Sequence, residues 1–155
     1  MADNRLRLQM ELKLQNKMKS ALHSQGWYAE KTSDRFKAGR PDLRIGNKQF
    51  GQLDIELKYR YEGYAVETEV GMTKLQWLTI KDMNEHCLPA VCLVYSEPLN
   101  VFFITTLLRD VLPPPSRRVL KLPGSDVIDG ATLFTKSMEH LYDIGYCKNI
   151  GRTRR

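Results

Sequence analysis

Long hydrophobic runs are absent from the sequence. No window approaches the roughly 18 consecutive apolar residues of a membrane-spanning helix, so we expect no contact with a membrane. The segment from Met1 to Leu14 alternates charged and apolar side chains, and it has neither the apolar run nor the small-residue cleavage site of a signal peptide. We therefore expect a protein that stays in the cytoplasm where it is made.

Cysteine is also scarce. Cys87, Cys92 and Cys147 have no paired close spacing, so neither a disulfide framework nor a four-ligand zinc site is predicted. His86 stands beside Cys87, but the residues that follow lead into an apolar strand, so we interpret Cys87 and Cys92 as core residues. The chain also lacks a glycine-rich phosphate loop of the Walker or dinucleotide type, which argues against an activity driven by nucleotide binding or hydrolysis.

Positive charge is what the chain has in excess. It carries 24 Lys and Arg against 18 Asp and Glu, a net charge of +6, with 42% hydrophobic residues. This composition is typical of one soluble domain, and its charge favours an anionic partner, most commonly nucleic acid. We expect a single domain over 1–155, with a core at about 4–112, a C-terminal extension at 116–147 after three prolines, and a basic tail at 148–155.

Hydrophobic periodicity predicts an α/β order of elements. The pattern gives helices and strands in the order α, β, β, β, α, β, β before the prolines, and one more helix after them. Thr73 is the predicted N-cap of the second helix, and Gly26 the stop signal of the first. The predicted helices are 4–25, 73–86 and 131–143; the predicted strands are 27–32, 42–45, 50–58, 90–95 and 101–106, with a hairpin turn at 46–48 and a loop or flap at 59–72.

The strand from Gln52 to Lys58 sorts its side chains by polarity, because successive residues of a strand point to opposite faces. Its apolar face carries Leu53, Ile55 and Leu57; its polar face carries Gln52, Asp54, Glu56 and Lys58. The polar face is either a solvated surface with a weak ion pair or part of a site. Asp42, at the start of the preceding strand, could meet Glu56 across the hairpin. Converging carboxylates call for a cation such as Mg²⁺ or Mn²⁺, which would activate water for phosphodiester hydrolysis.

Two motifs carry a family resemblance. Gly39-Arg40-Pro41-Asp42 followed by Glu56-Leu57-Lys58 resembles the PD-(D/E)XK nuclease superfamily, and Thr73-Lys74-Leu75-Gln76-Trp77-Leu78 resembles the glutamine-bearing helix of its VRR-NUC and Holliday-junction-resolvase-like branch. The resemblance covers about residues 10–106. It implies a restriction-endonuclease-like fold, that is, an α/β domain with a mixed central sheet flanked by helices.

The resemblance also implies roles for individual residues. Asp42 and Glu56 would bind the metal, Lys58 would serve the attacking water, Glu11 would match the acidic metal ligand of the first helix, and Gln76 would match the glutamine of the later helix. By helical geometry Glu11 lies at the edge of the apolar face, about 20° from Met18 and Leu22. It could point into the site or form a surface pair with Gln15 or Arg7.

Basic and aromatic side chains supply candidates for binding DNA. The predicted phosphate contacts are Lys31, Arg35, Lys37, Arg40 and Lys74 near the site, and Arg152, Arg154 and Arg155 in the tail. Each of them could instead be part of a solvated surface. Tyr59, Tyr61 and Tyr64 could stack on bases, rim a partner surface or pack the flap.

These patterns together predict a Mg²⁺- or Mn²⁺-dependent endodeoxyribonuclease, with branched DNA or junctions as one class of substrate. The alternatives are a nuclease-fold protein that binds DNA or assembles with little or no cleavage, and a protein-interaction module. A homodimer would be needed to cut a junction symmetrically. Stand-alone domains of this family occur in phages as well as in cells, so a phage protein acting in the host cytoplasm is compatible with the resemblance.

Overall fold

The structure is a computed structural model that describes residues 4–32, 40–60, 73–97, 101–105 and 129–146. The predictions for the loops at 33–39 and 61–72, for the prolines and for the basic tail lie outside these residues. The elements in chain order are α1 (Asn4–Ser24), β1 (Tyr28–Lys31), β2 (Leu43–Asn47), β3 (Gly51–Arg60), α2 (Lys74–Glu85), β4 (Ala90–Ser96), β5 (Val101–Thr105) and α3 (Gly130–Asp143).

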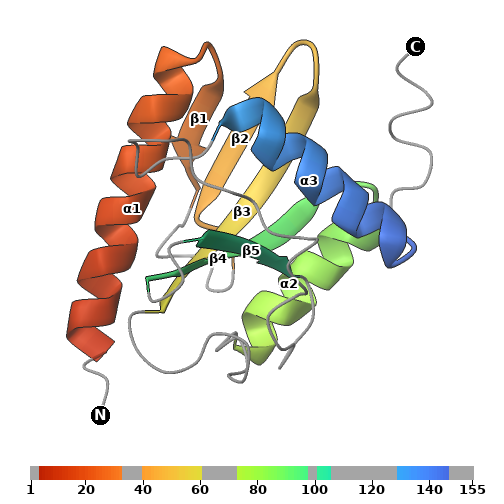
Figure 1. Ribbon diagram of the computed structural model, residues 1–155. Helices are drawn as coiled ribbons and strands as arrows, with labels where there is room; N and C mark the ends of the chain where they lie inside the picture. The colour runs from red at the N-terminus through yellow and green to blue at the C-terminus, as the bar shows by residue number, and fades with distance from the viewer. Residues whose placement is uncertain (1–3, 33–39, 61–72, 98–100, 106–128, 147–155) are drawn as a thin grey trace.

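The strands form one mixed sheet in the order β1-β2-β3-β4-β5 (Figure 1). Neighbouring strands are antiparallel except β3 and β4, which run parallel and are connected through α2. A parallel pair needs such a crossover, because a tight turn cannot bring the chain back to the same end of the sheet. The predicted α/β domain with a mixed central sheet flanked by helices is confirmed at this level.

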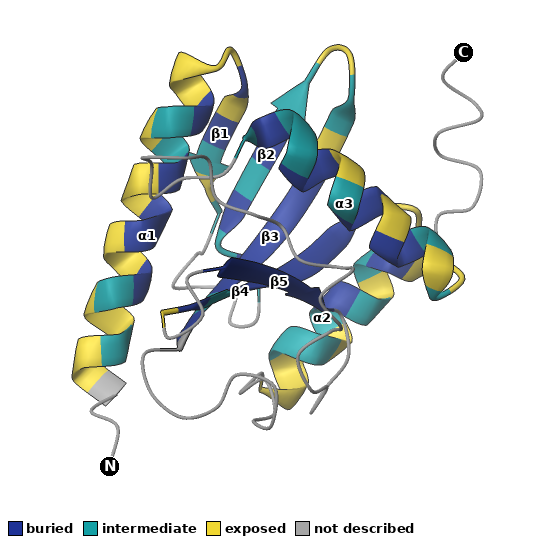
Figure 2. Ribbon diagram, viewed as in Figure 1, coloured by how far each residue is buried: buried dark blue, intermediate teal, exposed yellow. Residues whose placement is uncertain are grey.

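Helices cover both faces of the sheet. α1 and α3 pack over one face and α2 over the other (Figure 1). The first core joins apolar residues of α1 and α3 to the apolar face of β3: Leu14, Met18, Leu22, Leu133, Leu141, Leu53, Ile55 and Leu57. The second core, around Ile80, Val94 and Phe103, lies beneath α2. The central strands are consequently buried on both sides, as Figure 2 shows.

Local signals place the ends of α1 and α2 as predicted. Thr73 caps α2, where its hydroxyl accepts a hydrogen bond from the Gln76 amide while the Gln76 side chain accepts one from the Thr73 amide. This reciprocal capping box is a strong helix start. Gly26, which adopts a φ of 87° that side chains disfavour, follows the end of α1. No helix of the described residues is long and apolar enough to cross a membrane.

Three local predictions were wrong. Gly46 and Asn47 continue β2, and the turn occupies residues 48–50, where the Asn47 side chain accepts a hydrogen bond from the Gln49 amide at 2.8 Å. Tyr59 belongs to β3 rather than to a flap, because β4 continues to pair with it. Cys87 is exposed in the turn after α2, at a φ of 60°, whereas Cys92 lies in the core as expected.

Candidate active site

β3 extends past the start of β2, and two carboxylates occupy the edge that β2 leaves open. The pairing of β2 with β3 begins at Leu43 opposite Ile55. Beyond that point the Leu57 amide donates to Asp42 Oδ2 at 2.7 Å, and the Tyr59 amide donates to Glu11 Oε2 at 3.2 Å. Buried backbone amides require an acceptor. Asp42 and Glu11 therefore replace the missing strand, and the amides fix where the two carboxylates lie.

Glu56 extends from the same end of β3 on the face covered by α2. Its side chain is 4% exposed. Its Oε2 accepts a hydrogen bond from Gln76 Nε2 at 2.9 Å and lies 3.3 Å from Lys58 Nζ. Its Oε1 is buried and has no hydrogen-bond partner in the part of the chain that the structure describes. A buried polar atom without a partner is costly, so this oxygen is a candidate ligand atom.

Gln76 links the start of α2 to this cluster. Its Oε1 accepts hydrogen bonds from Lys58 Nζ and from the Thr73 amide, both at 3.0 Å, while its Nε2 donates to Glu56. One amide thus orients both the carboxylate and the ammonium group. Since the same amide belongs to the capping box, the position of α2 and the geometry of the cluster depend on each other.

Burial makes the negative charges of the cluster unfavourable. It raises the pKa of Glu56 to about 8, and the neighbouring charge of Asp42 acts in the same direction. Burial also raises the pKa of Asp42 and of Glu11, against the opposing charge of Lys58 and the backbone hydrogen bonds that each carboxylate accepts. Among the described residues, Lys58 opposes all three carboxyl groups and Arg7 also acts on Glu11, yet burial still favours the protonated form of Glu56 unless a further cation compensates.

This donor set suits a hard divalent cation. Carboxylate oxygens are the ligands that Mg²⁺ and Mn²⁺ prefer, and Mg²⁺ typically binds through one or two carboxylates plus water and substrate phosphate. Asp42 and Glu56 form such a pair, and Glu56 Oε1 has no hydrogen-bond partner within the described ranges. Across the described ranges no group of three or more His, Cys, Asp or Glu side chains is clustered as metal ligands. The predicted third ligand, Glu11, is placed at the Tyr59 amide.

Asp54 shows what the sequence alone missed. The polar face of β3 is predicted to be either solvated or functional, and the solvated alternative holds for Gln52 but is wrong for Asp54 and Glu56, which are 1% and 3% exposed. Arg44, directly opposite Asp54 in the sheet, binds it through two hydrogen bonds of 3.0 and 3.1 Å. The only sequence signal for this ion pair was the register of the hairpin, which depends on the position of the turn.

The described DNA-binding candidates neighbour cluster residues either along the chain or across the sheet. Lys31 is exposed at the end of β1, where the next amide, that of Thr32, donates to the Asp42 carbonyl at 2.9 Å. Arg40 is half-buried just before Asp42, and Lys74 is exposed in the first turn of α2. The other candidates, Arg35, Lys37, Arg152, Arg154 and Arg155, lie outside the described residues, as do Tyr61 and Tyr64.

The ring of Tyr59 packs into the core instead of lying on an open surface. It is 7% exposed and contacts the ring of Tyr95, with 5.3 Å between the ring centres, and its hydroxyl donates to Glu97. Of the three interpretations of the tyrosines, packing therefore describes Tyr59 best.

Comparison with known proteins identifies no relative of the chain. The chain matches no protein-family model and no curated protein.

Proposed function

We propose that the protein is a Mg²⁺- or Mn²⁺-dependent endodeoxyribonuclease with a restriction-endonuclease-like fold. The observation that supports this proposal best is the cluster at the carboxyl end of β3. There burial opposes the ionisation of Asp42 and Glu56 in spite of Lys58, and one Glu56 oxygen has no partner among the described residues. The resemblance of these residues to the PD-(D/E)XK motif points the same way.

In this proposal each side chain has a distinct task. Asp42 and Glu56 would hold the divalent cation, which supplies polarisation of a phosphoryl oxygen and a more acidic bound water. Lys58, in contact with Glu56 and Gln76, orients the attacking water and stabilises the negative charge that develops on the phosphate. Gln76 keeps both groups in place through its two hydrogen bonds to them. Glu11 holds the end of β3 and adds negative charge beside Glu56.

DNA is the proposed partner because of charge. The chain carries a net charge of +6, and Lys31, Arg40 and Lys74 lie near the cluster where phosphates would approach. Contacts of this kind give affinity that does not depend on base sequence and weakens with salt. We place the activity in the cytoplasm, and a junction substrate would require a homodimer to cut both strands symmetrically.

A cleavage assay with matched variants tests the proposal. The wild type is incubated with supercoiled plasmid and with a four-way junction in Mg²⁺, Mn²⁺ or EDTA, beside Asp42→Asn and Glu56→Gln. Glu139→Gln, on an exposed part of α3, is the control that removes one carboxylate elsewhere. We expect metal-dependent nicking by the wild type and the control, and loss of nicking with retained DNA affinity in the two site variants.

Each contrary result has a definite meaning. Wild-type rates in Asp42→Asn or Glu56→Gln, with contaminating nuclease excluded, would remove the active-site assignment. Binding of DNA without cleavage under any metal condition would identify a nuclease-fold binding protein. Absence of both binding and cleavage would favour a protein-interaction module.

A further inference from the structure

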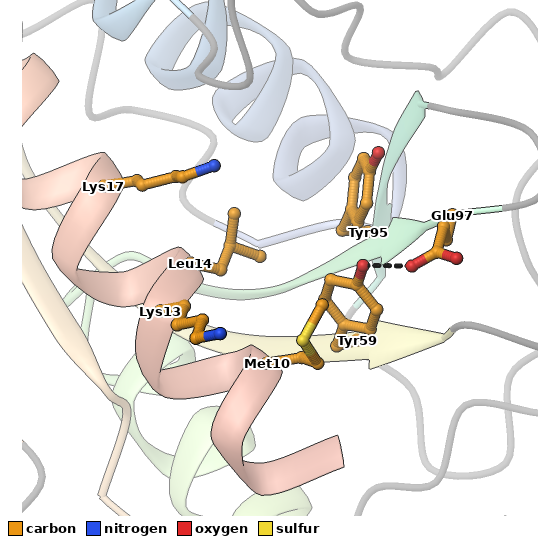
Figure 3. A pocket seen from close by; sticks show the side chains of 7 residues that line it. All are labelled: Met10, Lys13, Leu14, Lys17, Tyr59, Tyr95 and Glu97. Atoms are coloured by element: carbon orange, nitrogen blue, oxygen red, sulfur yellow. Dashed lines mark hydrogen bonds between the residues drawn. The ribbon is translucent and has the colours of Figure 1, made fainter. Parts of the chain in front are cut away.

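A concave site lies on the opposite face of the sheet from the carboxylate cluster. This cavity, of about 300 Å³, opens between α1 and the carboxyl ends of β3 and β4 (Figure 3). Lys58 and Tyr59 are consecutive in β3, so one points into the cluster and the other lines the cavity. The described residues that line it are Met10, Lys13, Leu14, Lys17, Tyr59, Tyr95 and Glu97.

The inner wall of the cavity is apolar and aromatic. Met10 and Leu14 come from α1, and the half-buried ring of Tyr95 faces them from β4. Tyr95 is held between Tyr59 and Phe102, with ring centres 5.3 and 5.0 Å away. A rigid aromatic wall of this kind offers contact area to a flat ring, and every nucleobase has such a face.

The rim of the cavity is positively charged. Lys13 and Lys17 stand one helical turn apart on α1, and Figure 3 shows both ammonium groups directed toward the tyrosines. Two ammonium groups at this spacing lie on the same side of a helix and could both contact one anionic group. The carboxylate of Glu97, on the opposite side, accepts a hydrogen bond from the Tyr59 hydroxyl. The rim therefore favours an anionic group close to α1.

We propose that this cavity binds one nucleotide of a single-stranded DNA segment, with the base against Tyr95 and Met10 and the phosphate between Lys13 and Lys17. This inference rests on the proposed function, since it assigns the cavity to the same substrate. The volume lies at the lower limit of ordinary ligand pockets, which is enough for one ring system but not for a paired duplex.

The two sites share structural elements that would align a strand bound to both. α1 gives Glu11 to the end of β3 and Met10, Lys13, Leu14 and Lys17 to the cavity. Both sites lie at the carboxyl ends of parallel strands, the usual place for ligands in α/β sheets. A base must leave its stack to enter the cavity, so the site favours DNA with a single-stranded segment over continuous duplex.

Binding measured without metal separates the cavity from the chemistry. In EDTA, the affinity of the wild type for a fluorescent ten-residue oligothymidine and for a duplex of equal length is measured by anisotropy. The double variant Lys13→Gln/Lys17→Gln is compared with Lys19→Gln/Lys48→Gln, which removes the same charge outside the cavity. Met10→Trp, which fills the cavity and keeps its charge, is measured beside them.

We expect both cavity variants to weaken single-strand binding by roughly tenfold, the double lysine variant through lost phosphate contacts and Met10→Trp through displacement of the stacked base. The control variant should lose less than about threefold, and duplex affinity should fall equally in the two double variants. Thermal unfolding of each variant identifies any that fails to fold, in which case the other cavity variant decides. Equal losses in cavity and control variants, or no single-strand binding by the wild type, would overturn the inference.

The cleavage assay makes the two failures distinguishable. If the cavity variants weaken binding of the oligothymidine but no metal-dependent nicking is found, the proposed nuclease activity is refuted and the cavity remains a nucleotide-binding site. Metal-dependent nicking together with a single-strand affinity that is unchanged in the cavity variants would refute the cavity as a binding site and support the nuclease activity.

Discussion

The buried carboxyl group of Glu56 should make the stability of the metal-free protein depend on pH. Its pKa is raised from 4.5 to about 8 in the folded chain, mainly by burial. Between these values the folded protein holds a proton that the unfolded chain releases. Stability must therefore fall as pH rises through this window, because ionisation favours the unfolded state. Glu56→Gln removes the titration while keeping a similar volume and an oxygen for Gln76 and Lys58.

The magnitude follows from the size of the shift. Each pKa unit corresponds to 1.36 kcal/mol, so the wild type should lose about 4 kcal/mol relative to Glu56→Gln between pH 4.5 and 8, and about 3 kcal/mol of this by pH 7. A domain typically has only about 5–15 kcal/mol of stability. The metal-free wild type should consequently be marginal at pH 8, where the variant stays folded.

Urea unfolding in EDTA at several pH values from 4.5 to 8 measures this difference. Glu139→Gln, an exposed residue of α3, is the matched control and should follow the wild type. Repeating the series with Mg²⁺ should restore stability to the wild type, most strongly at high pH, because the cation binds the ionised form. Glu56→Gln should gain little from Mg²⁺.

A constant difference between the wild type and Glu56→Gln across this range would refute the reasoning. It would mean that folding does not oppose the ionisation of Glu56, and the charge of the cluster would then need no added cation to compensate it. A pH-dependent difference that Mg²⁺ does not remove would keep the burial argument and refute the metal site.

Three further perturbations test other parts of the molecule. Lys58→Ala should lower kcat far more than metal affinity, measured by single-turnover cleavage and metal titration, and a loss of metal affinity like that of Asp42→Asn would show another role for the lysine. Arg44→Met leaves Asp54 buried without its partner and should cost about 2 kcal/mol in urea unfolding, with no loss contradicting the ion-pair argument. Truncation after residue 149 should flatten the slope of log K against log salt by up to about three units on duplex DNA, and an unchanged slope would show that the tail does not touch nucleic acid.

The helices and strands were predictable because their signals are local. The alternation along β3, the capping residues of α2 and the glycine after α1 each depend on a few neighbouring residues. Hairpin register is harder to predict than helices and strands, because moving the turn by two residues changes every cross-strand partner. A turn at 46–48 would have set Asp42 opposite Gln52. The turn at 48–50 instead brings Asp42 to the level of Glu56.

Burial of the site residues could not be predicted from the strand pattern alone. Alternation assigns Glu56 to a face of β3, but whether that face is solvated depends on α2, which reaches it only because β3 and β4 are parallel. The hydrogen bonds from the Leu57 and Tyr59 amides to Asp42 and Glu11 are likewise tertiary. The unequal lengths of β2 and β3 leave these amides without a strand partner, and which side chains reach them depends on how α1 and the start of β2 pack against β3.

The three carboxylates differ in whether a contribution to folding stability can explain an acidic residue at their position. Asp42 and Glu11 accept hydrogen bonds from otherwise unpaired amides of β3, a task that Asn and Gln could perform without a buried charge. Glu56 accepts no backbone hydrogen bond among those described, and its charge is opposed by burial and by Asp42. Replacing buried ionic groups by uncharged ones is often neutral or stabilising. Three buried acidic side chains at this place lower the stability of the fold. Residues that are unfavourable for stability in this way are typical of functional sites.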